Sequence, residues 1–413
     1  MGSQTITGCQ ICNSKNLENI LFLGYIPPVT TLHPIGDLPK EETFYPLNFV
    51  RCPKCTLVQI DFEVDPEKLF TKDYAYMTSV TRILRDNFAD LYRESSAMLK
   101  LKPEDFIVEF GSNDGTLLSN FKNAGHKVLG VEPTGIADIA NKNGINTKNV
   151  FFGKQSAADI KKEFGQAKVI LATNVFAHIV DINSVVDGII DLLTPDGVFI
   201  SESHYVLPLV QTLQYDTIYH EHLRNYSVRS IRYLLESRGL EVFFAKQVPT
   251  HGGSIRIYAG KKGQHPIDAS VGKMIEVEDK EGLTDGTSLK TFRDRVIKSK
   301  LDLFVLLAPL KSSGARIYGI GAPARACMIV NYLGLDDGSI DAVMEVKTSP
   351  KVNKYMPGTR IPIYDEAKLY VDQPEYALIF SWHIADELVK ILREKGYKGK
   401  FIIPLPEPRI LDI

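Results

Sequence analysis

The sequence predicts an α/β protein built from three parts, a small cysteine-bearing module followed by two regions of alternating strands and helices. Two Cys-x-x-C pairs lie near the start of the chain. From Phe106 onward, short apolar segments of strand length alternate with helical patterns, and a second such series begins at Arg316. Strands separated by helices favour parallel sheets, which bind ligands at the carboxyl ends of their strands.

Length and charge limit the class of protein. At 413 residues the chain is too long for one ordinary core, so two or three domains are expected. The 48 Lys and Arg residues nearly balance the 50 Asp and Glu residues, which argues against a nucleic-acid partner. The longest apolar segments are too short to cross a bilayer, and the chain opens without an apolar signal segment. We therefore expect a cytoplasmic protein without a membrane partner, and a monomer because no self-complementary apolar helix stands out.

The N-terminal cysteines predict a structural zinc site. Cys9 and Cys12 form one pair and Cys52 and Cys55 the other. Each pair places two thiolates on one tight turn, and two such turns complete a tetrahedron. Four thiolates leave no open position for substrate, so the zinc is expected to be structural rather than catalytic. The fifth cysteine, Cys327, is interpreted as a small apolar residue on a helix rather than as a nucleophile.

The remaining elements follow from periodicity and turn residues. A helix is expected over Val80–Leu99, after two tyrosines, Tyr74 and Tyr76, that fit either local packing or a cover over a polar ligand. The strands expected beyond it are Phe106–Phe110, Val128–Glu132, Val169–Thr173, Val198–Ser203, Leu240–Phe244, Ile255–Ala259, Arg316–Ile320, Ala342–Val346, Ala377–Trp382 and Phe401–Ile403. The helices expected are Thr116–Asn123, Ile182–Leu193, Ser288–Leu310 and Ala324–Tyr332. We place the domain boundaries at 1–75, 76–285 and 286–413.

The turn after the first of these strands indicates a site for a nucleoside ligand without a pyrophosphate. The segment Glu109–Gly115 reads Glu-Phe-Gly-Ser-Asn-Asp-Gly and does not fit the G-x-G-x-x-G fingerprint. Glu132 ends the next strand, where a carboxylate can accept hydrogen bonds from both hydroxyls of a ribose. The neighbouring acids favour a cationic sulfonium and amino group over a phosphate. These features resemble the S-adenosylmethionine (SAM) site of class I methyltransferases; the alternative is a plain strand-to-helix turn.

The segment Tyr215–Tyr226 carries the strongest indication of catalysis. It places a tyrosine, two histidines and a glutamate in the row Tyr219–His222, a polar sequence that no hydrophobic core requires. Imidazole titrates near neutral pH, so a positioned histidine is a common base when a proton leaves carbon or oxygen. For two of the histidines, a structural role is the alternative to catalysis. His222 would then only stabilise its segment through hydrogen bonds, and His178 would cap a strand-to-helix turn. His251 is expected to border the cleft and not to act as the base.

The second alternating region offers a site for a diphosphate. Gly319–Pro323 precedes a predicted helix, whose first N–H groups suit a diphosphate. Three basic residues lie in or near loops at the same expected edge: Arg325, Lys351 and Arg360. Each alone is more often a solvated surface charge, but together with the helix start they form a reasonable diphosphate site. The pattern Gly-x-Gly without a third spaced glycine is a weak fingerprint for an NAD(P)-dependent oxidoreductase.

Taken together, these motifs resemble the SAM-dependent C-methyltransferases that act at C-3 of dTDP-4-keto-deoxyhexoses. The resemblance covers essentially the whole chain, through the cysteine pairs and the segments 74–76, 111–115, 174–181, 218–222, 251–254, 319–325 and 349–359. It implies a zinc-binding N-terminal module, a central class I, Rossmann-like methyltransferase domain and a C-terminal Rossmann-like domain that binds the sugar nucleotide. The chain departs from the family near Arg325, where lysine is common, and near His383, where asparagine is common.

The resemblance also implies roles for particular residues. The base is His222, and Tyr219, Glu221, His178 and Tyr76 surround the reacting sugar. The cofactor-binding residues are Glu109, Gly111, Asn113, Asp114, Glu132, Asn174 and Phe176. The substrate-binding residues are Ala322, Arg325, Lys351, Arg360, Tyr219 and His178.

Two other classes of function remain open from the sequence. Methylation of a sugar nucleotide on oxygen or nitrogen would need no residues to stabilise an enolate, so the crowded segment Tyr219–His222 favours methylation on carbon. A zinc-ribbon binding protein on a non-catalytic methyltransferase scaffold is the second alternative. The intact acids Glu109, Asp114 and Glu132, together with His222, argue against it.

Overall fold

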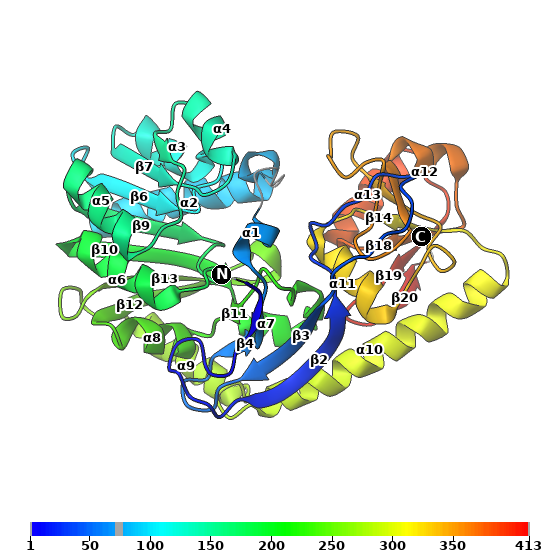
Figure 1. The fold of residues 1–413 in the computed structure, drawn as a ribbon, viewed down its shortest axis with the longest axis horizontal. Coiled ribbons are helices and arrows are strands. Elements are labelled where there is room, and N and C mark those ends of the chain that lie inside the picture. Colours follow the sequence, from blue (N-terminus) through cyan, green and yellow to red (C-terminus); the bar gives the residue numbers. More distant parts are fainter. Residues whose placement is uncertain (1, 71–76, 412–413) are drawn as a thin grey trace.

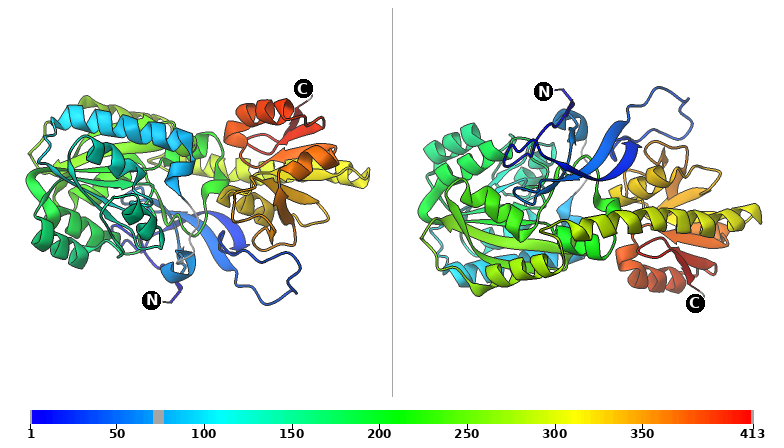
Figure 2. Two further views of the ribbon diagram at one scale, coloured as in Figure 1. Left: turned by 90° about the horizontal axis from the view of Figure 1, so that it is seen from above. Right: turned by 90° about the horizontal axis from the view of Figure 1, so that it is seen from below.

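The computed structural model describes residues 2–70 and 77–411, which form two α/β bodies with a smaller β module between them (Figure 1). Helix α10, Thr287–Ser312, extends from beneath the first body to the second. Seen from above and below, the N-terminal strands lie where the two bodies meet (Figure 2). The predicted α/β class with a cysteine module at the N-terminus is confirmed. Tyr74 and Tyr76 lie outside the described residues.

The N-terminal module is built on a four-stranded antiparallel sheet in the order β11-β4-β3-β2. Its own strands are β2 Glu18–Ile26, β3 Tyr45–Arg51 and β4 Val58–Ile60, and a small second sheet pairs β1 Gln4–Thr5 with β5 Phe62–Glu63. The fourth strand, β11 Arg224–Asn225, comes from the segment Tyr215–Tyr226. The module therefore includes residues that lie far away in the sequence.

The central body contains a seven-stranded sheet in the order β12-β13-β10-β9-β6-β7-β8. Its strands are β6 Phe106–Phe110, β7 Lys127–Val131, β8 Thr147–Lys148, β9 Ala167–Thr173, β10 Leu193–His204, β12 Leu240–Val248 and β13 Ser254–Lys261. The five strands from β8 to β10 run parallel, and β13 is antiparallel to both of its neighbours. Every residue of β6 is buried, as expected for a central strand covered on both faces.

Helices cover both faces of this sheet (Figure 1). They are α2 Arg82–Leu99, α3 Thr116–Asn123, α4 Ile136–Lys142, α5 Lys154–Phe164, α6 Ile182–Leu192, α8 Val228–Glu236 and α9 Ala269–Lys280. Shorter helices and 3-10 turns are α1 Pro66–Leu69, α7 Val206–Gln211, η1 Thr78–Val80, η2 Tyr215–Thr217 and η3 Thr250–Gly252. The strand order reverses between β6 and β9, and a crevice at the carboxyl ends of strands forms at such a switch point.

The C-terminal body also contains a seven-stranded sheet, in the order β16-β17-β15-β14-β18-β19-β20. Its strands are β14 Ile317–Ile320, β15 Ala342–Glu345, β16 Lys354–Tyr355, β17 Pro362–Asp365, β18 Tyr376–Ile379, β19 Lys400–Ile403 and β20 Arg409–Leu411. Its helices are α11 Ala324–Leu333, α12 Ala367–Asp372 and α13 Ala385–Glu394, with a 3-10 turn η4 at Trp382–Ile384. The parallel strand order reverses between β14 and β18, so the turn that precedes α11 lies at a second switch point.

The N-terminal module also contacts the C-terminal body directly. The connection between β2 and β3 reaches it, where Pro34 forms a β-bridge with Lys354 and the N–H of Tyr355 donates to the carbonyl of His33 at 2.8 Å. At the other end of the module, the guanidinium of Arg51 donates to the carbonyl of Thr284, just before α10. The module is thus attached to both bodies.

Several predicted boundaries are wrong for identifiable reasons. The helix expected to begin at Val80 starts at Arg82, because η1 occupies the preceding turn. The strand expected over Val198–Ser203 already begins at Leu193, which pairs with Ala167 of β9 and is separated from the regular register by a bulge. This bulge holds the turn residues 195–197, whereas the sequence suggested that they separate a helix from the strand.

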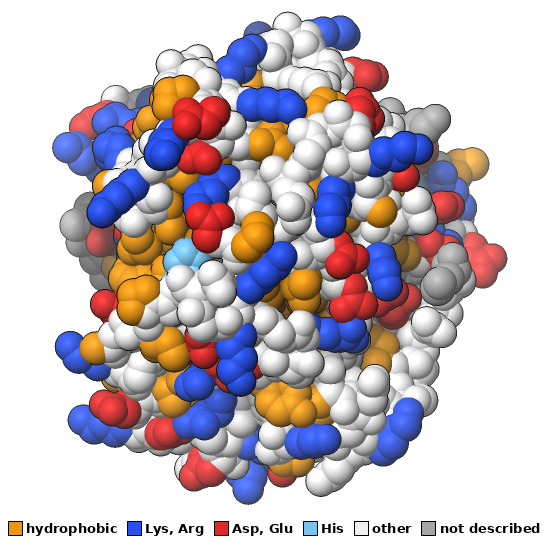
Figure 3. All heavy atoms as spheres, turned by 90° about the vertical axis from the view of Figure 1, so that its left-hand side faces the viewer, with side chains coloured by type: hydrophobic (Ala, Val, Ile, Leu, Met, Phe, Trp, Pro, Cys, Tyr) orange, Lys and Arg blue, Asp and Glu red, His pale blue; other side chains and the backbone are white. Residues whose placement is uncertain are grey.

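No helix among the described residues is long and apolar enough to cross a membrane. Figure 3 shows one face of the molecule with lysines and arginines interspersed among acids, without a large area of a single charge. This distribution agrees with the formal net charge of −2.

Candidate active site and metal centre

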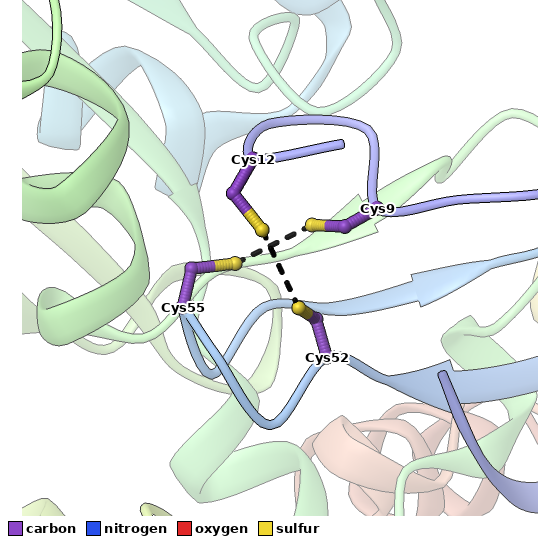
Figure 4. A group of neighbouring side chains, drawn as sticks. All are labelled: Cys9, Cys12, Cys52 and Cys55. Carbon is purple, nitrogen blue, oxygen red and sulfur yellow. Dashed lines mark hydrogen bonds between the residues drawn. The ribbon is translucent and has the colours of Figure 1, made fainter. Parts of the chain in front are cut away.

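The four N-terminal cysteines converge on one point (Figure 4). The Sγ atoms of Cys9 and Cys55 lie 3.3 Å apart, those of Cys12 and Cys52 lie 3.5 Å apart, and all four fall within 4.8 Å of one another. Four thiolates about 2.3 Å from a zinc ion form a tetrahedron with edges of roughly 3.8 Å. The cluster therefore has the size of a four-thiolate zinc site.

Local hydrogen bonds shape both cysteine turns in the same way. The N–H of Asn13 donates to the carbonyl of Cys9 at 2.9 Å, and the N–H of Thr56 donates to the carbonyl of Cys52 at 2.8 Å. Asn13 and Thr56 both have a positive φ, of 58° and 60°. Few residues other than glycine adopt this conformation, and for the β-branched threonine it is strained. The folded module holds both turns in this geometry, which aims the thiols at a common centre.

The N-terminal zinc module holds the segment that contains His222 at His220 and at its C-terminal end. On its C-terminal side, β11 pairs with β4, and the side-chain amide of Gln10 donates to the carbonyl of Leu223 at 3.3 Å. Within the segment, Nε2 of His220 lies 3.3 Å from the carbonyl of Pro46, at the start of β3. Gln10 lies between Cys9 and Cys12, so the metal-binding turn itself contacts the segment that contains His222.

The turn at the β6–β9 switch point packs tightly against the segment that follows β9. Gly111 has a φ of 63°, and a Cβ atom there would lie 2.5 Å from Cγ2 of Val175. The N–H of Asn113 donates to Oε2 of Glu132 at 3.0 Å, while Oε1 of Glu132 accepts from the N–H and hydroxyl of Thr134 at 3.0 and 2.7 Å. The predicted residues of this turn and the carboxylate at the end of β7 are thus brought together.

Glu109 fits a cationic cofactor at this switch point. Its carboxylate is buried at the end of β6, and Oε2 has no hydrogen-bond partner among the described residues. Burial raises its pKa well above the usual value, and the nearby charges of Asp114 and Glu132 add to this effect. A bound sulfonium or ammonium group would offset this concentration of buried negative charge. The residues present therefore suit SAM.

The chain just before α2 lies on this turn, held by Thr78 and Ser79. The hydroxyl of Thr78 donates to Oδ1 of Asp114 at 2.7 Å, and the N–H of Ser79 donates to Oδ2 of the same carboxylate at 2.9 Å. The N–H of Thr78 donates to Oδ1 of Asn113 at 3.0 Å. Asp114 and Asn113 thus fix the start of the segment that leads into α2, in addition to their expected place beside the cofactor.

Two further residues expected near the cofactor follow β9. Asn174 has a positive φ of 55°, and its N–H donates to the carbonyl of Glu202 at 2.7 Å. The ring of Phe176 is fully buried and packs against Phe199 and Tyr226, with centroids 5.3 and 5.7 Å away. Any contact of Phe176 with a cofactor would therefore come from its backbone.

His222 is held in one tautomer. Its Nδ1 lies 2.6 Å from the carbonyl oxygen of Thr217. A carbonyl oxygen can only accept, so Nδ1 carries the hydrogen and Nε2 keeps its lone pair. Burial is the main cause that lowers the pKa of His222 to about 4. The imidazole is therefore neutral at pH 7, the state in which it can take up a proton.

Aromatic side chains from four different segments surround His222. Tyr219, His178 and His204 have ring centroids 4.1, 4.9 and 4.8 Å from that of His222. His251 lies next to His204, with centroids 5.6 Å apart. Of the predicted catalytic residues, the structure brings together His222, Tyr219 and His178; Glu221 lies between His220 and His222, and Tyr76 falls outside the described residues.

His204 was missed by the sequence analysis. Its only signal is its position as the last residue of β10, at the carboxyl edge of the parallel strands. His251 adopts a left-handed conformation with a φ of 55° between Pro249 and the glycine pair Gly252–Gly253. A Cβ atom at Gly252 would lie 2.3 Å from Oε1 of Gln214. A side chain at this position would meet Gln214, and the positive φ of 85° also favours glycine.

Two buried histidines make a testable contribution to stability. Burial lowers the pKa of His220 and of His222 to about 4, whereas an unfolded histidine titrates near 6.5. Below pH 6.5 the unfolded chain therefore binds protons that the folded chain does not, so stability is highest above pH 6.5 and falls as the pH approaches 4. We expect the free energy of unfolding to drop by up to about 1.4 kcal/mol per pH unit for each histidine.

Urea unfolding between pH 7.5 and pH 5.0 measures this slope. The variant His220→Gln lacks one of the two groups, and its free energy of unfolding should depend less steeply on pH than that of the wild type. Equal slopes for the two proteins would contradict a neutral, buried His220.

The residues expected to bind a diphosphate are divided between two places. Nε and Nη2 of Arg325 each donate to a carboxylate oxygen of Asp216 at 2.9 Å. Asp216 lies shortly before the row Tyr219–His222. Lys351 is half-buried. Its Nζ donates to the carbonyl of Ala322 at 2.5 Å, and the N–H of Ala322 donates to Glu345 at 2.8 Å. These contacts occupy the turn before α11.

Arg360 has its contacts elsewhere, with the N-terminal module. Its Nη1 donates to the carbonyl of Asp37 at 2.8 Å, and its guanidinium lies 4.8 Å from the centroid of the Tyr355 ring. Arg360 thus helps to attach the connection between β2 and β3 to the C-terminal body.

A doubly wound sheet with an acidic, glycine-containing turn at its switch point is typical of SAM-dependent methyltransferases. Comparison with family models agrees with this. Residues 80–243 match a methyltransferase domain, residues 249–406 match a C-methyltransferase C-terminal domain, and residues 9–70 match a family described as "Putative zinc binding domain".

Over its whole length the chain is similar to the C-methyltransferase NovU of Streptomyces niveus. The two are 31% identical over 412 residues, which cover 98% of this chain and 97% of NovU. The chain therefore belongs to this family of SAM-dependent C-methyltransferases with a zinc-binding N-terminal module. The expected enzyme class, SAM and zinc are thereby confirmed.

Solved structures resemble only part of the chain. A SAM-dependent methyltransferase from Anabaena variabilis is 16% identical, covers 46% of this chain and 89% of its own, and has a TM-score of 0.36. The magnesium protoporphyrin IX methyltransferase ChlM of Synechocystis, solved with bound SAM, is 13% identical, covers 43% of this chain and 79% of its own, and has a TM-score of 0.34.

Proposed function

We propose that this C-methyltransferase removes a proton from C-3 of a dTDP-4-keto-6-deoxyhexose and methylates that carbon. The observation that carries the proposal is the neutral imidazole of His222, whose Nδ1 is bound to the carbonyl of Thr217 and whose Nε2 is left as a base. The dTDP-linked 4-keto sugar itself rests on the resemblance of the motifs set out above. A hydrogen next to a ketone is acidic enough to be removed when the resulting enolate is stabilised.

In the first step, Nε2 of His222 takes the C-3 hydrogen as a proton, and the electron pair of the C–H bond moves toward the C-4 carbonyl oxygen. Tyr219 or His178 donates a hydrogen bond to that oxygen as its charge develops. The ring centroids of both lie within 5 Å of His222, which supports this role. Burial and the neighbouring histidines lower the pKa of His178, so it would act as a neutral donor. Glu221 orients an imidazole or a hydroxyl of the sugar, and Tyr76 is assigned to the same cleft.

In the second step, C-3 of the enolate forms a bond to a methyl group. SAM supplies this methyl as an electrophile, and its sulfur–carbon bond breaks as the new carbon–carbon bond forms. The residues assigned to hold SAM are Glu109, Gly111, Asn113, Asp114, Glu132, Asn174 and Phe176. Their task is to fix the methyl at near-contact distance from C-3, because methyl transfer depends on such positioning.

We assign binding of the sugar nucleotide to the C-terminal body. Its turn at the β14–β18 switch point, with Ala322 just before α11, has the position at which ligands bind to open parallel sheets. Arg325, Lys351 and Arg360 are the basic residues proposed for the diphosphate. This assignment divides the chain into a zinc module over 1–75, a methyltransferase domain over 76–285 and a sugar-nucleotide domain over 286–413.

The test is mass spectrometry of dTDP-4-keto-6-deoxyglucose after incubation with the protein and SAM in deuterated water. We expect the mass of one added methyl group, together with exchange of C-3 hydrogen for deuterium in sugar that has not yet reacted. Deuterium exchange without methylation would support the base and point to a different sugar. If neither methylation nor deuterium exchange occurs with this sugar or with its 2-deoxy and 3-amino variants, the 4-keto-sugar proposal is wrong.

A further inference from the structure

A buried charged group joins the C-terminal body to the segment that contains the base. The carboxylate of Asp216, in η2, is fully buried and accepts from both Nε and Nη2 of Arg325, in the first turn of α11. The indole N–H of Trp382, in η4, donates to Oδ2 of the same carboxylate at 2.8 Å. The guanidinium of Arg325 also lies 5.0 Å from the centroid of the Trp382 ring. We call Asp216, Arg325 and Trp382 the interdomain clasp.

We propose that this clasp is a positioning device for the catalytic base, through which the C-terminal body orients His222. The inference rests on the proposed function, in which His222 is the base. Asp216 immediately precedes Thr217, whose carbonyl oxygen fixes the tautomer of His222. Arg325 and Trp382 hold Asp216, Asp216 fixes the adjacent Thr217 peptide, and that peptide directs the imidazole.

Two further contacts make the segment rigid at this point. The ring of Tyr215, on one side of Asp216, packs edge-on against Tyr332 of α11 with centroids 5.3 Å apart. The amide of Gln214 donates to the carbonyl of Gly252 at 2.7 Å, next to His251. Through this bond, η2 also fixes the turn that carries His251. A carboxylate bound by a planar guanidinium at two points has little freedom to rotate, so its backbone has few alternative conformations.

The clasp places a cation near the histidine cluster and pairs it with a buried carboxylate. Arg325 is close enough to the histidine cluster that its charge lowers the pKa of four histidines: His204, His222, His251 and His383. For each of them burial is the larger cause. Asp216 neutralises the guanidinium locally, while the indole N–H adds a third donor to the carboxylate. The charged and titratable groups around His222 are therefore Asp216, Arg325, Tyr219, His178, His204 and His251.

A positioning role and a diphosphate-binding role for Arg325 predict different kinetics. A residue that orients the base acts on the chemical step and changes kcat. A residue that binds the diphosphate equally in ground and transition state changes KM. The variant Asp216→Asn separates them, because it keeps the shape of the side chain but frees Arg325 from its carboxylate. Positioning predicts a lower kcat, whereas a liberated phosphate ligand predicts tighter substrate binding.

The experiment compares Asp216→Asn and Trp382→Phe with the wild type, all as full-length zinc-loaded protein. Trp382→Phe removes the indole N–H together with the five-membered ring and keeps one aromatic ring, so it tests the clasp without altering Asp216 itself. Glu375→Gln is the matched control, since its carboxylate accepts from Nε and Nη2 of Arg316 in the same body, but at an exposed site. We measure kcat and KM for dTDP-4-keto-6-deoxyglucose, and melting temperature for each variant.

A second readout does not depend on turnover. Nitrogen NMR of protein with labelled histidine reports which imidazole nitrogen of His222 carries the hydrogen, and His222→Asn identifies its signals. We expect one tautomer, with hydrogen on Nδ1, in the wild type and in Glu375→Gln. We expect mixed tautomers in Asp216→Asn, together with a kcat about 100-fold lower and a nearly unchanged KM. Trp382→Phe should show a smaller loss in the same direction.

The possible outcomes are distinct. An unchanged kcat with an altered KM, or an unaltered His222 tautomer in both clasp variants, would overturn the proposal. If Asp216→Asn does not fold, Trp382→Phe alone decides between the two roles. If the wild type leaves the sugar unmodified while the tautomer of His222 still changes in the clasp variants, the proposed substrate fails and the positioning role stands.

Discussion

Replacing His222 with asparagine is expected to reduce methyl transfer by roughly 100- to 10,000-fold, the range that a general base contributes. The amide nitrogen of asparagine can occupy the place of Nδ1 and donate to the carbonyl of Thr217, so the segment should keep its conformation. What is lost is the nitrogen that takes up the proton. The melting temperature should therefore change little while catalysis collapses.

The decisive experiment uses mass spectrometry to measure two quantities, the exchange of hydrogen for deuterium at C-3 and the gain of a methyl group. Both should disappear together in His222→Asn, because both require removal of the same proton. The control is His220→Gln, two residues away, whose replacement can still donate to the carbonyl of Pro46. It should retain methyl transfer. Methyl gain at the wild-type rate in His222→Asn would show that another residue is the base.

How much the sequence predicted depends on whether a feature is local. Three features depend only on residues a few positions apart in the sequence: the cysteine turns, the Glu109–Gly115 turn and the row Tyr219–His222. Such features can be recognised from the sequence alone. Many strands and helices of both α/β bodies were found for the same reason, since periodicity is a local property. The helices α4, α5, α8, α9, α12 and α13 were not predicted. Ends of elements were less accurate, as at Leu193, where pairing with Ala167 extends a strand into a segment of turn residues.

Features that depend on packing between distant segments could not be predicted. Asp216 and Arg325 are separated by 109 residues and Asp216 and Trp382 by 166, so no spacing in the sequence connects them. An isolated arginine near a glycine turn suggested a phosphate ligand, and its bidentate contact with Asp216 could not be read from the sequence because it forms only where the two bodies pack together. His204 has no motif around it, and the strand β11 is too short to recognise without its partner β4.

Removing the zinc is expected to abolish catalysis although the metal has no open coordination position. Structural zinc sites contribute on the order of 10 kcal/mol or more to the folding of small modules, and the sheet β2–β4 is small. Without it, β11 loses its neighbour β4, Gln10 no longer holds Leu223, and the segment around His222 loses its support. Cys9→Ser, or chelation of the reduced protein, should therefore lower the melting temperature and reduce C-3 deuterium exchange to background.

Binding of SAM distinguishes this account from general unfolding. The switch point between β6 and β9 is built from the central sheet, whose strands pair with one another and not with the zinc module. Calorimetry should therefore show that the zinc-free protein still binds SAM while proton exchange at C-3 is lost.

Cys327→Ser is the matched control, because Cys327 is buried in α11 beside Pro357 and Asn331, away from the four-cysteine cluster. If the zinc-free protein exchanged the C-3 proton at the wild-type rate, the metal module would have no part in holding the base. If SAM binding vanished along with exchange, the loss would reflect collapse of the whole fold rather than release of one segment.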